Sequence, residues 1–478
     1  MSRPPQDPRR ARSRSGPPRR PQTRRPPVVD PARQVALDLL TAVRERNAYA
    51  NLTLPGLITA AGLTGRDAAL ATELGYGTCR ALGQLDAIIA AGGDRALADL
   101  DGAALDALRL GAYQLLRTRI PPHAAVSATV DLVRAGPVPG AAGYVNAVLR
   151  RVSEADLPTW IDRLAPSAAE DPLGHLSVAT AHPRWITVAF SDALGATAGR
   201  VTGPGAELPA ALAADDQPPP VHLIARPGRI DRDDLVRDSG GSPTRFSRYG
   251  VVLGHGDPGR IAAIVDGRAA VQDEGSQLVA TALATAPLDG ADARWLDLAA
   301  GPGGKAGLLG ALAAQRGAMV HAVELAPHRA DLVRRTVAGL PVTVLVADGR
   351  DPGLPAASFD RVLLDAPCTG LGALRRRPES RWRRLPSDVA DLVRLQRELL
   401  ASAARLVRPG GLIGYVTCSP HLSETAGIIT RRPAGLDLVD ARPLLPGVPD
   451  LGEEPTVQLW PHRHGTDAMF LALLQRSG

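Results

Sequence analysis

The chain has 478 residues, of which 45% are hydrophobic and only 3% are aromatic, enough apolar residues for roughly two to four packed domains. We expect no membrane association, since no apolar run is long enough for a membrane span and the N-terminus lacks the apolar core of a signal peptide. Residues 1–30 carry nine Arg and two Asp, or +7, so with a net charge of +6 the rest sums to −1. The three cysteines are too scattered for a disulfide framework or a zinc site, which favours a cytoplasmic protein without a structural metal.

The first 155 residues divide into an Arg- and Pro-rich tail and a helical domain. Residues 1–30 have almost nothing to bury, so we expect them to be disordered, either as a phosphate-binding arm or as a solubilising extension. Residues 31–155 have apolar residues at helical spacing, separated by Gly and Pro breaks, and predict a compact all-α bundle. The expected helices are 32–44, 52–61, 66–82, 85–91, 103–117, 124–134 and 141–152.

The remaining chain predicts a small α+β domain and a larger α/β domain. Residues 156–262 suggest short helices from 182 and 231 and strands at 221–225 and 251–254, possible in an RNA-recognition-like (RRM-like) sheet, although no base-stacking aromatics are visible. Residues 263–478 alternate strands and helices, as in a Rossmann-like, doubly wound parallel sheet. The expected strands are 293–298, 319–324, 342–347, 360–365, 412–417 and 468–474, and the expected helices are 274–286, 305–316, 327–338 and 388–407.

A Gly-rich loop follows the first strand of the α/β domain. The segment from Trp295 to Lys305 runs from a short apolar stretch through glycines into an Ala/Leu-rich helix, an arrangement that presents backbone N–H groups to a polar ligand. It is not a nucleoside-triphosphate loop, because Ala299 and Ala306 replace the Gly and Ser/Thr of that pattern. Lys305 is the only lysine in the chain, which suggests a position where a compact ammonium is needed and a planar guanidinium does not serve.

Acidic residues stand at the ends of successive expected strands. Asp297, Glu324, Asp348 and Asp365 all fall at the carboxyl edge, where open α/β sheets bind their ligands. Glu324 lies about 20 residues past the loop, the usual place for an acid that binds ribose hydroxyls, and Asp348 is suited to an adenine amine. A dinucleotide or an S-adenosyl compound fits this pattern. The missing Gly-x-Gly-x-x-Gly register favours S-adenosylmethionine.

Two cysteines follow the fourth and fifth strands and indicate the reaction. Cys368, beside Asp365, and Cys418 should project into one crevice, where a pair of thiols suggests thiolate chemistry. A redox pair is the alternative, although Cys-x-x-Cys spacing is missing. Carbon 5 of a pyrimidine is a poor nucleophile until a thiolate adds at carbon 6 while an acid protonates nitrogen 3. A nucleophilic cysteine, an acid and a second group that assists release would meet that need.

Several segments resemble the Sun (Fmu) family of RNA cytosine-5 methyltransferases, of the bacterial ribosomal small-subunit methyltransferase B type. They are residues 271–277, 300–305, 365–368, 375–378, 417–419 and 464–467. Residues 108–116, 122–126 and 143–151 resemble the NusB-type RNA-binding helical domain, with a helical spacer as the alternative. The family usually has Cys, Ala and Thr where this chain has Ala299, Gly301 and Ala306, and Asn where it has Thr425 after Glu424.

The resemblance implies a role for each matching residue. Cys418 is the implied nucleophile, Cys368 assists product release, Asp365 also hydrogen-bonds the cytosine, and Lys305 lies near the target base. The implied S-adenosylmethionine-binding residues are Ala299, Ala300, Gly301, Pro302, Gly303, Gly304, Lys305, Glu324, Asp348 and Asp365. The implied RNA contacts are Asn146, Arg150, Arg151 and Arg376.

The expected function is therefore S-adenosylmethionine-dependent methylation of carbon 5 of cytosine in 16S, or small-subunit, ribosomal RNA. We expect a monomer that uses no metal. The alternatives are methylation of another RNA such as tRNA, a transferase without the cysteine chemistry, and a non-catalytic RNA-binding or ribosome-assembly factor.

Overall fold

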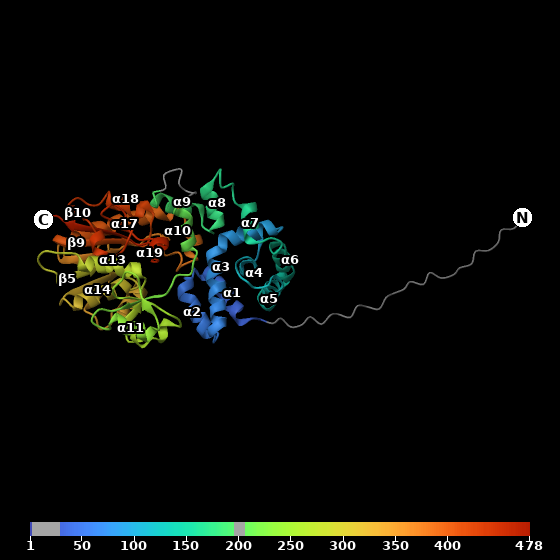
Figure 1. Ribbon diagram of the computed structural model, residues 1–478, viewed down its shortest axis with the longest axis horizontal. Coiled ribbons are helices and arrows are strands. Elements are labelled where there is room, and N and C mark those ends of the chain that lie inside the picture. Colours follow the sequence, from blue (N-terminus) through green and yellow to red (C-terminus); the bar gives the residue numbers. More distant parts are fainter. Residues whose placement is uncertain (2–28, 196–205) are drawn as a thin grey trace.

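The computed structural model describes residues 29–195 and 206–478, together with Met1. Almost all of the Arg-rich tail expected at 1–30 lies outside the described residues, so its disorder stays a prediction. Figure 1 shows a helical part on one side of the molecule and a sheet-containing part on the other. No helix within the described ranges is long and apolar enough to cross a membrane.

Six helices form the bundle expected near the N-terminus. They are α1 (Pro31–Arg46), α2 (Ala50–Ala60), α3 (Gly65–Gly92), α4 (Gly102–Arg117), α5 (Pro122–Ala135) and α6 (Ala142–Val152). The Asp30 carboxylate caps α1 by accepting a hydrogen bond from the Arg33 N–H at 2.9 Å. The apolar stripes of α1, α3, α4 and α6 meet in one core that includes Leu39, Leu108 and Leu149. The predicted all-α bundle is confirmed.

The break expected between residues 82 and 85 is wrong, because α3 continues from Gly65 to Gly92. Gly83, which falls between the two helices expected here, lies against the ring of Trp382, and a Cβ at this position would overlap that ring. Glycine therefore serves close packing between distant segments here. It does not end the helix.

The middle of the chain contains more helix than expected, followed by a small sheet. Helices α7 (Leu157–Leu164), α8 (Pro172–Ala179), α9 (Arg184–Ala193) and α10 (Leu208–Asp215) precede the strands. An antiparallel sheet of order β2-β3-β1-β4 follows, with β1 (His222–Ala225), β2 (Ser242–Pro243), β3 (Gly250–Val252) and β4 (Ala269–Val271). It carries α11 (Arg232–Ser239) and α12 (Ala262–Val265). Its last strand lies beyond residue 262, the domain boundary expected from the sequence.

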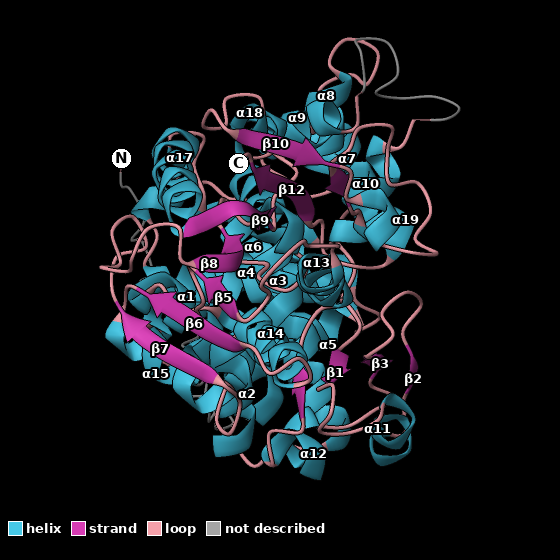
Figure 2. Ribbon diagram, turned by 90° about the vertical axis from the view of Figure 1, so that its left-hand side faces the viewer, coloured by secondary structure: helices cyan, strands magenta, loops and turns pink. Residues whose placement is uncertain are grey.

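The C-terminal domain contains a mixed sheet of order β10-β12-β9-β8-β5-β6-β7, visible in Figure 2. The five strands from β9 to β7 run parallel, as expected, whereas β12 and β10 pair antiparallel and β11 pairs with β12. The strands are β5 (Arg294–Asp297), β6 (Met319–Glu324), β7 (Val342–Val346), β8 (Phe359–Asp365), β9 (Val407–Thr417), β10 (Leu436–Val439), β11 (Val457–Gln458) and β12 (Phe470–Arg476). The Rossmann-like fold is confirmed, and the antiparallel edge makes the sheet mixed.

Helices cover both faces of this sheet. On one face, α13 (Glu274–Thr285) and α14 (Gly304–Ala314) pack on β5 and β9 through a core that includes Leu283, Leu309 and Trp295. On the other face lie α17 (Asp388–Leu406) and α18 (Ala426–Ile429), which bury Leu399 and Ile428. Helix α15 (Pro327–Thr336) packs on β6 and β7. The central strands β8 and β9 are buried on both sides, whereas the edge strand β7 is partly exposed.

The short helix α16 (Ser380–Arg383) joins the C-terminal domain to the helical part. The Arg381 side chain is wholly buried, and its guanidinium donates to the carbonyl oxygen of Ala181 at 3.0 Å and to the Asp216 carboxylate at 3.1 Å. It also donates to the Asp215 carboxylate at 3.3 Å. The Trp382 indole donates to the Arg80 carbonyl oxygen of α3 at 2.9 Å. One turn of chain therefore connects helices α3, α8 and α10 with the C-terminal domain.

Replacing Arg381 by Ala should destabilise the whole chain. The change removes a buried cation from Asp215 and Asp216, whose remaining partners are His182 and Arg117, a loss of up to about 3–5 kcal/mol in the free energy of unfolding. Urea denaturation of the full chain measures it. Arg394→Ala is the matched control, because Arg394 pairs with Asp391 on the exposed side of α17 and should cost less than about 1 kcal/mol. Equal losses in the two variants would contradict the assigned role of the junction.

Candidate active site

The Gly-rich loop connects the end of β5 to the start of α14. Gly303 caps α14 with a φ of 110°, and a Cβ there would lie 3.0 Å from the Cβ of Thr336 and 3.1 Å from the Cα of Val333. Both the left-handed backbone and the close approach of α15 therefore require glycine. The loop brings the N-terminus of α14 to the carboxyl edge of the sheet, the expected position for receiving a polar ligand.

Asp297 is a completely buried acid at the start of this loop. Both of its carboxyl oxygens are buried and lack a hydrogen-bond partner within the described part of the chain. Burial, together with the nearby charge of Asp365, raises the pKa of Asp297 to about 7. A buried carboxyl group without a partner is costly, so this position is suited to a ligand that supplies a hydrogen bond.

Glu324 and Asp348 lie at the ends of β6 and β7, as expected. The Glu324 carboxylate accepts hydrogen bonds from the backbone N–H of Gly301 at 3.1 Å and of Ala326 at 2.9 Å. Glu324 thus connects its strand end to the Gly-rich loop. Asp348 is paired with Arg350, whose Nη2 lies 2.6 Å from Asp348 Oδ2. Hydrogen bonds from Arg350 lower the pKa of Asp348 and keep it ionised.

Lys305 forms an ion pair with Asp365, with 2.8 Å between Nζ and Oδ2. Lys305 lies in the first turn of α14 and Asp365 ends β8, so the pair joins the Gly-rich loop to the neighbouring strand. The ammonium is largely buried, and burial lowers its pKa, but the charge and hydrogen bond of Asp365 outweigh this effect and raise the pKa of Lys305 overall. The Lys305 ammonium therefore stays charged in the crevice.

The two cysteines at the strand ends lie side by side, with 3.5 Å between their Sγ atoms. The hydrogen bond from Cys368 lowers the pKa of Cys418, and the charges of Arg377 and Lys305 act in the same direction, although burial opposes them. The same hydrogen bond and burial raise the pKa of Cys368 well above its usual value. Cys418 is thus the thiol that ionises first, with the Cys368 S–H donating to it.

Hydrogen bonds to Glu424 join the loop that carries Cys368 to the loop that carries Cys418. Its buried carboxylate accepts hydrogen bonds from the Thr369 N–H at 2.8 Å, the Thr369 hydroxyl at 2.5 Å and the Ser419 hydroxyl at 2.7 Å. Gln396 of α17 also donates to it, at 3.1 Å. Thr369 follows Cys368 and Ser419 follows Cys418, so a single carboxylate fixes the separation of the two thiols.

The sequence reasoning missed Thr369, Ser419 and Gln396. A hydroxyl residue directly after each cysteine was one available signal, and a Gln at a buried position of α17 was another. Thr425, which replaces the Asn usual in the resembled family, is also buried. Its hydroxyl donates to the His421 carbonyl oxygen at 3.1 Å and so supports the turn after Cys418.

The residues expected to contact RNA lie in two places. Arg376 is engaged in ion pairs with Asp273 at 2.6 Å and Asp467 at 2.9 Å. Asn146, Arg150 and Arg151 lie on α6, which Figure 1 places on the side of the bundle away from the sheet, and Arg151 donates to the Gly92 carbonyl oxygen. Their contact with RNA stays a prediction, and the structure does not bring them to the cysteine pair.

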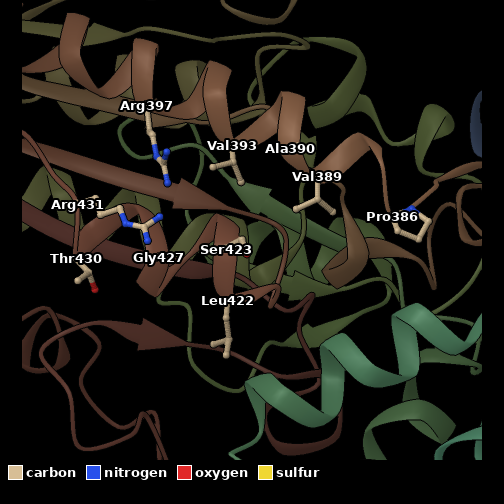
Figure 3. Close-up of a pocket in the computed structure, with 10 residues that line it drawn as sticks. All are labelled: Pro386, Val389, Ala390, Val393, Arg397, Leu422, Ser423, Gly427, Thr430 and Arg431. Carbon is tan, nitrogen blue, oxygen red and sulfur yellow. The ribbon is translucent and has the colours of Figure 1, made fainter.

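A separate groove of about 610 Å³ lies between α17 and the segment that leads into α18, as Figure 3 shows. It is lined by Val389, Val393, Arg397, Leu422 and Arg431, among other residues. Neither cysteine lines this groove, nor does any residue of the Gly-rich loop. The groove is therefore separate from the cysteine pair and the Gly-rich loop at the sheet edge. Within the described ranges, no cluster of three or more His, Cys, Asp or Glu could hold a metal ion.

Comparisons with known proteins agree with this architecture. Residues 30–154 match the NusB family, and residues 282–475 match the family described as 16S rRNA methyltransferase RsmB/F. A Mycobacterium tuberculosis protein named as a methyltransferase is 56% identical over 96% of this chain and 98% of its own length. The ribosomal RNA small subunit methyltransferase B of Erwinia tasmaniensis is 30% identical over 92% of this chain and 98% of its own.

Solved structures share the fold. PH0851 has a TM-score of 0.77 at 23% identity and covers 94% of this chain and 99% of its own. NSun6 from Pyrococcus horikoshii, solved with SFG, has a TM-score of 0.52 at 18% identity and covers 62% and 98%. A NusB-type bundle joined to a Rossmann-like methyltransferase domain defines an RNA methyltransferase. The chain belongs to the ribosomal RNA small subunit methyltransferase B family, which confirms the resemblance noted in the sequence.

Alkylation by iodoacetamide should distinguish the three cysteines. Because its pKa is lowered, Cys418 should reach half-maximal reaction at a lower pH than an ordinary thiol. Cys79 should stay unreactive in the folded chain, because it is fully buried and burial raises its pKa to about 12. Peptide mass spectrometry over a pH series measures each site.

The variant Cys368→Ala should move the Cys418 profile to higher pH, because it removes the hydrogen bond that stabilises the thiolate. Cys79→Ala is the control and should leave that profile in place. An unchanged profile in Cys368→Ala would mean that the 3.5 Å contact does not control the ionisation of Cys418.

Proposed function

We propose that this RNA methyltransferase transfers a methyl group from S-adenosylmethionine to carbon 5 of a cytosine in 16S ribosomal RNA, through a covalent bond between Cys418 and the base. The observation that carries the proposal is the position of two thiols, 3.5 Å apart, at the same sheet edge as the Lys305–Asp365 ion pair. We further propose that the chain acts as a monomer, and that the base is flipped out or single-stranded, since its carbons are inaccessible in a stack.

The residues at the Gly-rich loop fit S-adenosylmethionine. The buried Asp297 carboxyl lacks a partner, Gly303 leaves the backbone bare, and Glu324 and Asp348 offer carboxylates at the next two strand ends. We assign donor binding to residues 299–305, Glu324, Asp348 and Asp365. When bound, S-adenosylmethionine supplies an electrophilic methyl group. Lys305 and Asp365 hold the loop and strand β8 together beside the cysteines.

Cys418 performs the first chemical step in this proposal. Its thiolate bonds to carbon 6 of the ring, and the electron pair of the carbon 5–carbon 6 double bond moves so that carbon 5 becomes enamine-like. The ring takes a proton at nitrogen 3 from Asp365, which gains that proton from solvent as the base binds, hydrogen-bonds this edge of the base and is left as a carboxylate. Lys305, 2.8 Å from Asp365, stabilises the negative charge of that carboxylate.

Cys368 assists the last steps. After methyl transfer has left S-adenosylhomocysteine, carbon 5 loses its proton to solvent and nitrogen 3 returns its proton to Asp365. The double bond then reforms and the carbon 6–sulfur bond breaks, which returns Cys418 as a thiolate. The raised pKa of Cys368 keeps its thiol protonated, so it can donate a hydrogen bond to the departing sulfur. Because Cys368 keeps its proton and Cys418 ionises, Cys418 acts as the nucleophile and Cys368 as the donor, although both lie at the same edge.

The variant Cys368→Ala should accumulate a covalent protein–RNA adduct, because addition continues while release is impaired. Full-length protein is incubated with S-adenosylmethionine and in vitro transcribed 16S RNA, and a shifted band that survives denaturing electrophoresis reports the adduct. Cys418→Ala should form no adduct and lose methylation by at least about a thousandfold, on the order of the loss when a covalent nucleophile is removed. Cys79→Ala is the control and should behave as the parent chain.

Bisulfite sequencing of the same RNA identifies the methylated base. Full turnover by Cys418→Ala would refute the covalent step, and methylation at an atom other than carbon 5 would refute the assigned chemistry. Methylation of tRNA but not of 16S RNA would show that tRNA is the substrate.

A further inference from the structure

The loop between α1 and α2 contacts Arg383 and Arg377 of the C-terminal domain, and the charge of Arg377 acts on Cys418 by lowering its pKa. Asn47 ends α1 with a φ of 49°, which turns the chain sharply, and residues 47–49 then run toward the C-terminal domain. Arg383 of α16 donates to the carbonyl oxygens of Asn47 at 3.1 Å and Ala48 at 2.9 Å. These two bonds fix the position of the next residue, Tyr49.

Tyr49 is an exposed aromatic residue beside two guanidinium groups. Its relative exposure is 46%, so nearly half of the side chain is accessible to solvent. The Cζ atoms of Arg377 and Arg383 lie 5.8 Å and 5.6 Å from the centre of its ring. Cation–π contacts at this distance orient a ring while leaving part of its surface open.

Arg377 lies one short helical segment away from the nucleophile. The segment η4 (Leu371–Ala373) follows the Cys368 loop, and the N–H of Gly372 donates to the carbonyl oxygen of Cys418 at 2.9 Å. The Arg377 N–H then donates to the Ala373 carbonyl oxygen at 3.1 Å. Arg377 is exposed, and across residues 29–195 and 206–478 its guanidinium forms no ion pair.

Tyr49 and Arg377 therefore combine the two groups that bind single-stranded RNA. An exposed ring offers a stacking surface for a base, and an unpaired guanidinium offers a contact for a phosphate. Arg383 is held by two carbonyls, whereas Arg377 can leave the ring without breaking a hydrogen bond. A base can then occupy the face of the ring while the guanidinium turns to the adjoining phosphate.

We propose that Tyr49 of the helical bundle and Arg377 of the catalytic domain together bind a nucleotide of single-stranded RNA that flanks the target cytosine. This inference rests on the proposed function for the identity of the target, but not for the contact itself. It gives the NusB-type domain a residue at the rim of the active site, on a different element from α6, where the sequence places its RNA contacts.

A purely structural role for Tyr49 predicts a different outcome. If the ring only anchors the bundle, its loss should lower stability and leave RNA affinity unchanged in the folded protein. The two hydrogen bonds from Arg383 to the loop involve backbone carbonyls and remain in any Tyr49 variant. The exposed side chain can therefore be removed without removing the anchor.

The test compares Tyr49→Ala and Tyr49→Phe in the full chain, with in vitro transcribed 16S RNA as the probe. Tyr49→Ala should raise the Kd for RNA about tenfold, the loss expected for one stacked base, while Tyr49→Phe should bind like the parent. KM for RNA should rise with Kd, while kcat and the affinity for S-adenosylmethionine stay within about twofold. Thermal unfolding of each variant verifies that it is folded.

Arg377→Ala tests the phosphate contact separately. It should reduce the slope of log Kd against log salt concentration by about 0.7, the value for one phosphate on a single strand. Arg163→Ala is the matched control, since Arg163 is also exposed and lies 5.1 Å from an aromatic ring, that of Trp160 in α7. It should leave the slope unchanged.

The possible results separate this inference from the proposed function. Unchanged RNA affinity in Tyr49→Ala, with normal methylation by the parent chain, would overturn the inference alone. Loss of RNA affinity in Tyr49→Ala, with no carbon-5 methylation by the parent chain, would support the RNA contact and overturn the proposed reaction. A loss of affinity in Tyr49→Phe equal to that in Tyr49→Ala would contradict stacking.

Discussion

The ion pair between Lys305 and Asp365 holds together the two halves of the site. Lys305 belongs to the helix that follows the Gly-rich loop, and Asp365 belongs to the strand that leads to Cys368. Two opposite charges in a largely buried crevice attract each other strongly, so their separation of 2.8 Å also sets the distance between these elements. The only lysine in the chain stands at this position, where its compact ammonium reaches the Asp365 carboxylate.

The fold brings residues that are far apart in the sequence to the same site. Parallel strands β5, β6, β7, β8 and β9 all end at one edge, so residues more than a hundred positions apart become neighbours. Glu424 then sets the finer geometry, because it accepts hydrogen bonds from the residues that follow both cysteines. The difference in pKa between the two thiols depends on the close contact between their sulfur atoms, which this geometry maintains.

Much of this arrangement could be predicted from the sequence, because its signals are local. The helical spacing of apolar residues predicted α1 and α17, and apolar runs predicted the central strands. The predicted strands in turn placed Glu324 and Cys418 directly after strand ends. What could not be predicted depends on contacts between distant residues. Two helices were expected on either side of Gly83, but one continuous helix forms, in which Gly83 packs against Trp382, 299 residues later. Arg381 and Tyr49 likewise have no periodic or motif signal, since their environments come from other domains.

The buried guanidinium of Arg381 also determines which part of the chain can be exchanged as one piece between related proteins. Its acceptors come from Arg80 in the bundle, from Ala181 after α8, and from Asp215 and Asp216 at the end of α10. A hybrid that takes only the six-helix bundle from a relative would therefore divide this set of acceptors between two parents. The exchangeable module is residues 31–216, so recombination within the family has a natural crossover point just before the small sheet.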